Sequence, residues 1–298
     1  MLEIIGAESM GVRSLCCRVT LPEQRVVIDP GVALGYVRYG LLPHPEQIAV
    51  GRRIRERILE ALEDATDVVF SHFHGDHVPL VNANPYQLSV HSLPPGFREL
   101  RAWSKSGDDL SKVMSDRRQA LLELLGNNMR DAEGVTAGRL SFSRAVPHGA
   151  PDSNRGTVMM TRVEMDDGVF VHASDIQLLD AATIDLLIDW RPDVVLAAGP
   201  PLYLDRLSST LRETAWNNAV RLAQHIEVVI LDHHLMRSRE GAEWLDALSN
   251  TIGRQVYCAA DYMGQPRRLL EAEREQWYQK IPVPEGWHED YAQDKKGK

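Results

Sequence analysis

Three histidines and one aspartate fall within seven positions, in the stretch SHFHGDH at residues 71–77. The chain has 11 histidines among 298 residues, so the pattern H-x-H-x-D-H would arise by chance about one time in a thousand at this composition. Imidazole and carboxylate groups together suit zinc, and also iron or manganese. The stretch therefore indicates a metal site more strongly than it indicates a polar surface turn.

The spacing within this motif divides its side chains between two positions. His72 and His74 alternate in an extended segment, so they project in the same direction. Gly75 allows a tight turn, after which Asp76 and His77 point to a second place nearby. One loop can thus supply two ligands to each of two metal ions, and a catalytic pair of ions needs further ligands from elsewhere.

Candidates for the further ligands follow other short apolar runs, and they are His148, Asp175, His233 and His234. Strand ends in α/β proteins are where sites collect, so these residues are expected to meet the motif. Taken alone, His148 could be an ordinary loop histidine, and Asp175 could be the N-cap of a following helix. Arg155 is either a surface arginine or a residue that holds an anionic group of a substrate.

The elements that must position these residues are short strands and amphipathic helices. Apolar, β-branched runs predict strands at 12–20, 25–31, 66–71, 88–91, 140–146, 157–165, 168–174, 192–199, 227–232 and 254–260. Helical spacing predicts helices at 51–65, 176–190, about 208–224, about 239–250 and 266–280. Because helices must cover buried sheets, and the strands suffice for two sheets, we predict a layered α/β fold.

Two segments differ from the rest of the chain. Residues from about 97 to about 134 are highly charged with a helical seam of leucines, which predicts one or two helices inserted between strands. This helical insertion either decorates the surface or forms a lid or a dimer contact. The last residues, 285–298, are predicted to be a polar tail, which leaves one domain over 1–284.

Composition limits the partners that we expect. The net charge is −9 and the pI about 5.7, so the large basic surface of a dedicated nucleic-acid binder is missing. The arginines at 52, 53, 55 and 57 are interpreted as a solvated helix face. The start MLEIIGAESMG lacks the features of a signal peptide, and no run is apolar enough to span a membrane. We therefore expect a cytoplasmic protein that acts on a small molecule, either as a monomer or as a homo-oligomer.

The order of these motifs resembles the metallo-β-lactamase superfamily over about residues 1–260. Within that span, GAESMGVRSLCCRV, DPGVALGYVRYGLLPHP, SHFHGDH and AAGPPLYL are similar to an uncharacterised prokaryotic family of predicted metal-dependent hydrolases. The resemblance implies a four-layer αβ/βα sandwich with a two-metal cleft along one edge. It implies no particular substrate.

The resemblance also implies a role for each candidate ligand. It assigns the first metal to His72, His74 and His148, the second metal to Asp76, His77 and a late histidine, and the bridge between the metals to Asp175.

For the late histidine we prefer His233, because one polar residue separates it from its strand, with His234 as the alternative. Asp29, at the end of VVID, matches a family position that supports the histidine loop from behind.

The chemistry that this resemblance implies is hydrolysis by a metal-bridging hydroxide. Asp175 and Asp76 would be the catalytic carboxylates, and Asp76 could also handle a proton. A di-iron oxidoreductive branch typically has a carboxylate at the position of His74, so the histidine favours hydrolysis. We expect two divalent ions, zinc first and iron or manganese as alternatives, and a small anionic substrate such as a phosphoester. The alternatives are a nuclease acting on RNA or DNA and a non-catalytic metal-binding scaffold.

Overall fold

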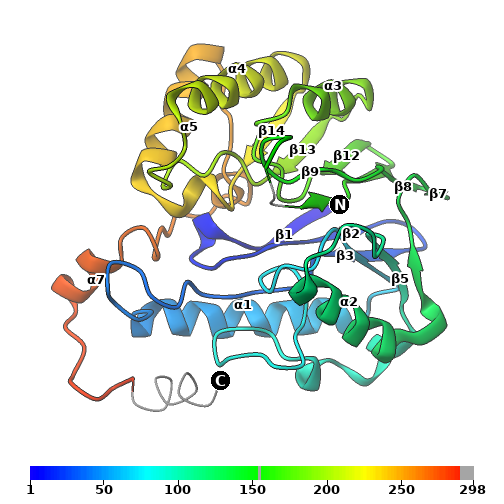
Figure 1. Ribbon diagram of the computed structural model, residues 1–298, viewed down its shortest axis with the longest axis horizontal. Coiled ribbons are helices and arrows are strands. Elements are labelled where there is room, and N and C mark those ends of the chain that lie inside the picture. The colour runs from blue at the N-terminus through cyan, green and yellow to red at the C-terminus, as the bar shows by residue number, and fades with distance from the viewer. Residues whose placement is uncertain (154–155, 289–298) are drawn as a thin grey trace.

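The computed structural model describes residues 1–153 and 156–288, and it forms four layers. Two six-stranded sheets face each other, with α1 and α2 outside the first sheet and α3, α4 and α5 outside the second (Figure 1). The predicted α/β class and αβ/βα layering are confirmed. The helices are α1 (Pro45–Glu63), α2 (Lys112–Leu125), α3 (Ala181–Asp189), α4 (Ser209–His225), α5 (Arg239–Ile252), α6 (Ala259–Tyr262) and α7 (Arg274–Lys280).

The first sheet has its strands in sequence order, with the β1, β2 and β3 pairs antiparallel and the rest parallel. It contains β1 (Leu2–Ala7), β2 (Leu15–Thr20), β3 (Arg25–Ile28), β4 (Asp67–Phe70), β5 (Arg101–Ser104) and β6 (Met129–Asp131). Every residue of β4 is buried. A parallel strand covered on both faces is expected to be apolar throughout, as VVF is.

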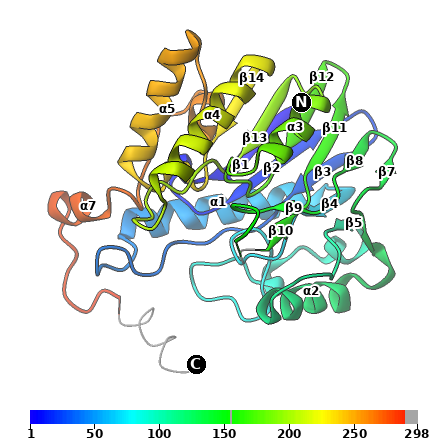
Figure 2. The same ribbon diagram turned by 45° about the horizontal axis from the view of Figure 1, so that its top comes forward.

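The second sheet runs in the order β14-β13-β12-β11-β8-β7, with β12, β13 and β14 parallel (Figure 2). It contains β7 (Thr136–Ala137), β8 (Leu140–Phe142), β11 (Thr161–Met165), β12 (Gly168–His172), β13 (Val194–Ala197) and β14 (Val228–Leu231). A separate hairpin joins β9 (Val146–Pro147) to β10 (Thr157–Val158). The strands predicted at 140–146 and 157–165 therefore each break in two, where the chain leaves the sheet toward His148.

Several predicted boundaries were wrong. β1 was not predicted, residues 90–92 form a 3-10 turn in place of a strand, and residues 254–258 make only a single bridge through Tyr257 before α6. The helix predicted from 176 begins at 181, because Asp180 caps it by accepting from Thr183 N at 3.0 Å. Of the segment 266–280, which was predicted to be helical, only α7 forms an α-helix.

The stretch around 97–134 is not purely helical. It contains α2 as predicted, but also β5 and β6, which extend the first sheet beyond β4. Both strands are short and partly exposed, so neither has a strong apolar signal. Of the predicted tail, residues 289–298 lie outside the described part of the chain.

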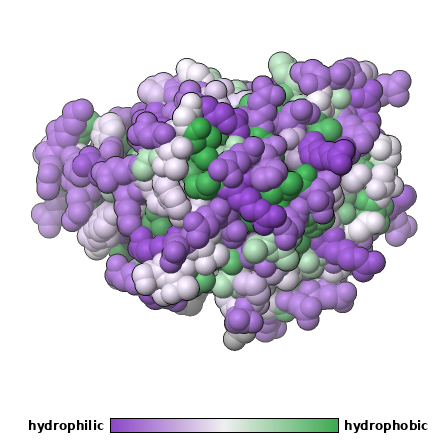
Figure 3. All heavy atoms as spheres, turned by 90° about the horizontal axis from the view of Figure 1, so that it is seen from above, coloured by the Kyte–Doolittle hydropathy of each residue, from purple (hydrophilic) through white to green (hydrophobic). Residues whose placement is uncertain are grey.

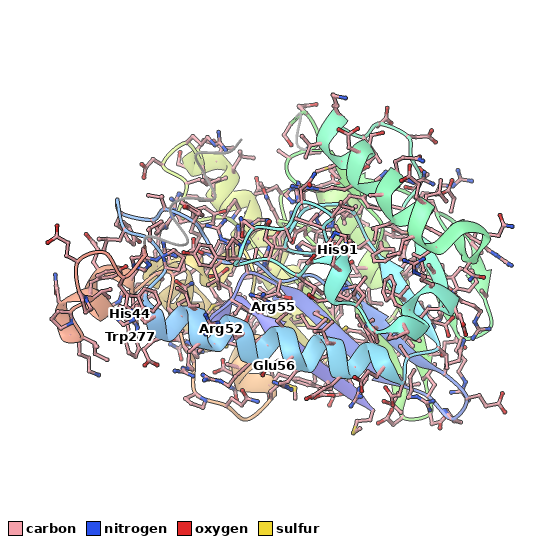
Figure 4. The ribbon with its side chains drawn as sticks, turned by 90° about the horizontal axis from the view of Figure 1, so that it is seen from below. His44, Arg52, Arg55, Glu56, His91 and Trp277 are labelled. Atoms are coloured by element: carbon pink, nitrogen blue, oxygen red, sulfur yellow. The ribbon has the colours of Figure 1, made fainter. Side chains whose placement is uncertain are left out.

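The outer surfaces are polar, as expected for a layered fold. Seen from the side of α4, apolar residues reach the surface only in small patches among hydrophilic ones (Figure 3). On α1, Arg52 and Arg53 are exposed, and Figure 4 shows Arg52, Arg55 and Glu56 along that helix. Within the described residues, no helix is both long and apolar enough to cross a bilayer.

A buried arginine fastens the C-terminal segment to the first sheet's helix layer. Arg274 is fully buried and donates to the carbonyl of Gly35 at 2.6 Å, to that of Leu41 at 2.9 Å, and to Gln47 Oε1 at 3.0 Å. Nearby, the rings of His44 and Trp277 lie 6.0 Å apart where α7 meets the start of α1 (Figure 4).

We expect Arg274→Met to lower the free energy of unfolding by at least about 3 kcal/mol, because it leaves buried oxygens without donors. Chemical denaturation measures this loss. Arg53→Met, on the exposed side of α1, is the matched control and should change stability by less than about 0.5 kcal/mol. Equal effects of the two substitutions would contradict this account of the C-terminal segment.

Candidate metal centre

The histidine loop leaves β4 at Ser71 and turns back at once. His77 N and Val78 N both donate to the carbonyl of His74, at 3.0 and 3.2 Å. The turn lies directly against Gly31, where an added Cβ would sit 2.3 Å from the carbonyl carbon of His77. A side chain at Gly31 would therefore push the loop out of place. Gly75, by contrast, has no left-handed φ.

The first group of ligand atoms consists of His72 Nε2, His74 Nδ1, His148 Nε2 and Asp175 Oδ2. His72 lies 2.9 Å from His74, and the carboxylate oxygen lies 3.4, 3.6 and 3.0 Å from the three imidazoles in that order. Four ligands around a zinc ion at ordinary bond lengths are about 3.3 Å from one another. The spacing of this group fits one such ion.

The second group brings together Asp76 Oδ2, His77 Nε2 and His233 Nε2. His233 lies 3.4 Å from each of the other two atoms. The other carboxylate oxygen of Asp175, Oδ1, lies 3.2 Å from His77 and 3.5 Å from His233. These separations fit a second ion in the same way.

Asp175 lies between the two groups with one oxygen toward each. It is 1% exposed, and its Oδ1 has no hydrogen-bond partner among the described residues. A buried carboxylate oxygen without a donor is costly unless something binds it. The interpretation of Asp175 as a helix N-cap is wrong, because Asp180 fills that position.

Asp29 contacts the loop from behind. Its carboxylate accepts from Ser71 N at 2.8 Å, from Ser71 Oγ at 2.5 Å and from His77 Nδ1 at 2.9 Å. Ser71 Oγ in turn lies 3.0 Å from His72 Nδ1. Asp29 holds a left-handed φ of 50°, a strained conformation for a non-glycine residue. These contacts turn the Nε2 atoms of His72 and His77 toward the site.

The two late histidines face different sides of Asp175. His233 Nδ1 lies 3.1 Å from the carbonyl of Ser14, which turns its Nε2 toward the second group. His234 Nδ1 lies 3.4 Å from Tyr203 Oη, and its Nε2 lies 3.4 Å from Asp175 Oδ2. The preceding Asp232 fixes this loop by accepting from Ser9 N at 3.0 Å and from Ala259 N at 2.8 Å.

Arg237 reaches the second group and pairs with Glu8, and sequence reasoning missed both. Arg237 Nη2 lies 3.3 Å from Asp76 Oδ2, and its Nε donates to Glu8 Oε2 at 3.1 Å. The same Nη2 lies 2.6 Å from His233 Nε2 and 3.4 Å from His233 Nδ1. Arg237 is therefore in close contact with the ring nitrogen of His233 that faces the second group. The one signal of this pair in the sequence was Glu8, an acidic residue within the apolar first segment.

Burial keeps most of the imidazoles neutral, the form that binds metals. It lowers the pKa of His72 to about 3 and that of His233 to about 4. His77 differs: burial alone would lower its pKa, but Asp175 and Asp29 outweigh burial and raise it well above the ordinary value. The pKa of Asp175 is held well below its usual range despite burial, chiefly by His77 and His233.

The first group opens onto a surface hollow of about 610 Å³. His74, whose side chain is 32% exposed, and His148 line this hollow together with Asp109, Leu110 and Met114 around the start of α2. The 97–134 segment therefore borders the opening of the site. Arg155, the candidate substrate-binding arginine, lies outside the described residues.

Comparisons with known proteins give the family. No family model matches the chain. A UPF0282 protein from Methanosarcina mazei is 46% identical over 296 residues, which cover 99% of this chain and 97% of that protein. This chain belongs to the UPF0282 family. Another member, from Methanopyrus kandleri, is 33% identical over 286 residues, 91% of this chain and 97% of its own length.

Solved structures show that this chain has the metallo-β-lactamase fold. A metal-dependent hydrolase of the β-lactamase superfamily aligns with a TM-score of 0.51 at 13% identity, over 86% of this chain and 94% of that chain. The di-iron β-hydroxylase CmlA from Streptomyces venezuelae aligns with a TM-score of 0.52 at 15% identity, over 90% of this chain and 53% of its own. The predicted resemblance to both the superfamily and the family is confirmed.

We expect metal affinity to fall as the pH is lowered. His77 carries a proton in the metal-free site, because its pKa is raised, and this proton must leave before Nε2 can bind a cation. The zinc Kd, measured by chelator competition, should weaken up to about tenfold per pH unit below neutrality.

The control for this prediction is Asp29→Asn. It removes one anion that raises the pKa of His77, so its zinc affinity should depend less steeply on pH. A zinc Kd that stays constant between about pH 6 and about pH 8 would show that no proton is displaced.

Proposed function

We propose that this chain is a hydrolase that uses two divalent metal ions, most favourably zinc. The observation that carries the proposal is the position of Asp175, whose two oxygens face separate groups at the spacing of zinc ligands. His72, His74 and His148 would hold one ion, and Asp76, His77 and His233 the other. Asp175 would bridge them.

Two divalent ions held in this way lower the pKa of a shared water toward neutrality and polarise the oxygen of a bound ester or amide. The chain's residues set the conditions for that chemistry. Asp29 fixes the rings of His72 and His77, and Arg237 fixes Asp76. Asp76, whose Oδ2 belongs to the second group, is the residue in this proposal that accepts or returns a proton, through its other oxygen, Oδ1.

Charge favours an anionic substrate. Two divalent ions would face three carboxylates, Asp29, Asp76 and Asp175, with Arg237 beside Asp76, so at least one positive charge remains before a hydroxide binds. A phosphoester is attracted by such a site, and the hollow of about 610 Å³ has the size of a small-molecule pocket. The net charge of −9 disfavours the alternative of a large RNA or DNA substrate.

The related structures include more than one chemistry. One neighbour is an isothiocyanate hydrolase from Delia radicum gut bacteria, with a TM-score of 0.50 at 14% identity over 83% of this chain. CmlA is a di-iron β-hydroxylase. The presence of imidazole at His74, where the resemblance predicts a carboxylate in a di-iron oxidoreductive enzyme, is what supports hydrolysis here.

Elemental analysis of protein purified without added metal tests the proposal. We expect the wild type to hold close to two metal ions per chain and Asp175→Ala to lose at least one, because both groups lose a ligand. Asp180→Ala, which removes a carboxylate from the cap of α3, is the matched control and should keep both ions.

Activity is tested on the same preparations against phosphodiesters, phosphomonoesters, thioesters and lactones. The wild type should hydrolyse one class, and His74→Ala should reduce kcat/KM by at least about a hundredfold. Two bound ions without turnover on any class would instead favour the metal-binding scaffold. An unchanged metal content in Asp175→Ala would remove Asp175 from the bridge.

A further inference from the structure

His234 is a buried histidine with one ring nitrogen aimed into the metal centre, beside the carboxylate of Asp175. The residue is 7% exposed, and its Nε2 has no hydrogen-bond partner among the described residues. That atom lies 3.4 Å from Asp175 Oδ2, and the ring lies 5.4 Å from that of His148. A buried polar atom left in this way calls for a partner from outside the chain.

The hydrogen bonds behind His234 favour one of its two ring nitrogens as the site of the proton. Arg237 has only donors, so Tyr203 Oη accepts from its Nη1, at 3.4 Å. The single Tyr203 hydrogen is then free to point at His234 Nδ1, also at 3.4 Å. Because Nδ1 accepts, the neutral ring carries its hydrogen on Nε2. A protonated Nε2 has no lone pair for a metal ion.

The neighbouring histidine has the opposite arrangement. His233 Nδ1 faces the carbonyl of Ser14, which can only accept, so its hydrogen is on Nδ1 and Nε2 carries the lone pair. His77 also has its hydrogen on Nδ1 and its lone pair on Nε2, because Nδ1 faces Asp29, which accepts. The contact of His148 with Gln177 decides nothing, because an amide offers both a donor and an acceptor. Of the two adjacent histidines, His233 thus presents a metal ligand and His234 presents a hydrogen-bond donor to the same site.

We propose that His234 donates a hydrogen bond from Nε2 to the substrate oxygen on which negative charge develops, and that it binds no metal. This inference rests on the proposed function, since the oxygen in question is the carbonyl or phosphoryl oxygen under attack. A fixed donor at such a position stabilises developing charge without reorganisation. Glu8, Arg237 and Tyr203 form the chain of contacts that holds the donor in place.

The test uses zinc-loaded full-length protein and inorganic phosphate as the oxyanion probe. Metal content after dialysis is measured first, for the wild type, for His234→Ala and for His233→Ala as the matched control. We expect His234→Ala to retain as much zinc as the wild type and His233→Ala to lose about one equivalent. Loss of zinc from His234→Ala equal to that from His233→Ala would make His234 a ligand and overturn the inference.

Phosphate affinity is then measured by calorimetry on the proteins that retain zinc. We expect His234→Ala to weaken the Kd about tenfold, the effect of losing one hydrogen bond to a charged group. His234→Gln, which keeps an N–H donor, should recover part of this loss. Unchanged phosphate affinity in His234→Ala, or no phosphate binding by zinc-loaded wild type, contradicts the inference.

The proton position can also be observed directly, without any variant. In nitrogen–proton correlation spectra of the zinc-loaded wild type, His234 should carry its hydrogen on Nε2 and His233 on Nδ1. A hydrogen on Nδ1 of His234 would overturn the inference even if a variant failed to fold. A wild type that binds no zinc refutes the proposed function at the first step, before phosphate is added.

Discussion

A buried carboxylate that faces six imidazoles is the constraint on which this structure depends. Burying Asp175 without compensation would cost several kcal/mol, yet the chain places it where both sheets end and surrounds it with imidazoles. The loops that follow β4, β9, β12 and β14 meet at this point. The two-sheet fold is thus what allows residues more than a hundred positions apart to share one carboxylate.

The residues behind the ligands act through hydrogen bonds and charge. Asp29 sets the rings of His72 and His77 at the edge of the first sheet, while Asp232 holds the loop of the late histidines at the edge of the second. Arg237 reaches the site from that same loop and pairs with Glu8 from the first sheet's edge. Both sheets therefore contribute residues that orient ligands, which favours a preorganised site.

Most of the site could be predicted because metal chemistry leaves a dense local signal. The motif at 71–77 and the strand-end positions of His148 and Asp175 are visible in the sequence, and so is the layered fold. Arg237 and Glu8 were missed because their pairing depends on tertiary contact across 229 positions. The predicted strand ends and helix starts differ from the observed ones where the chain leaves a sheet toward the site. The loop there continues the apolar pattern of the strand before it, so the sequence does not mark the boundary.

Anomalous diffraction at the zinc edge, from crystals of zinc-loaded protein, tests the central claim most directly. The account predicts two zinc peaks about 3.5–4 Å apart, on opposite sides of the Asp175 carboxylate. One peak should lie among the first group and the other among the second. A single peak, or peaks whose ligands do not include Asp175, would contradict it.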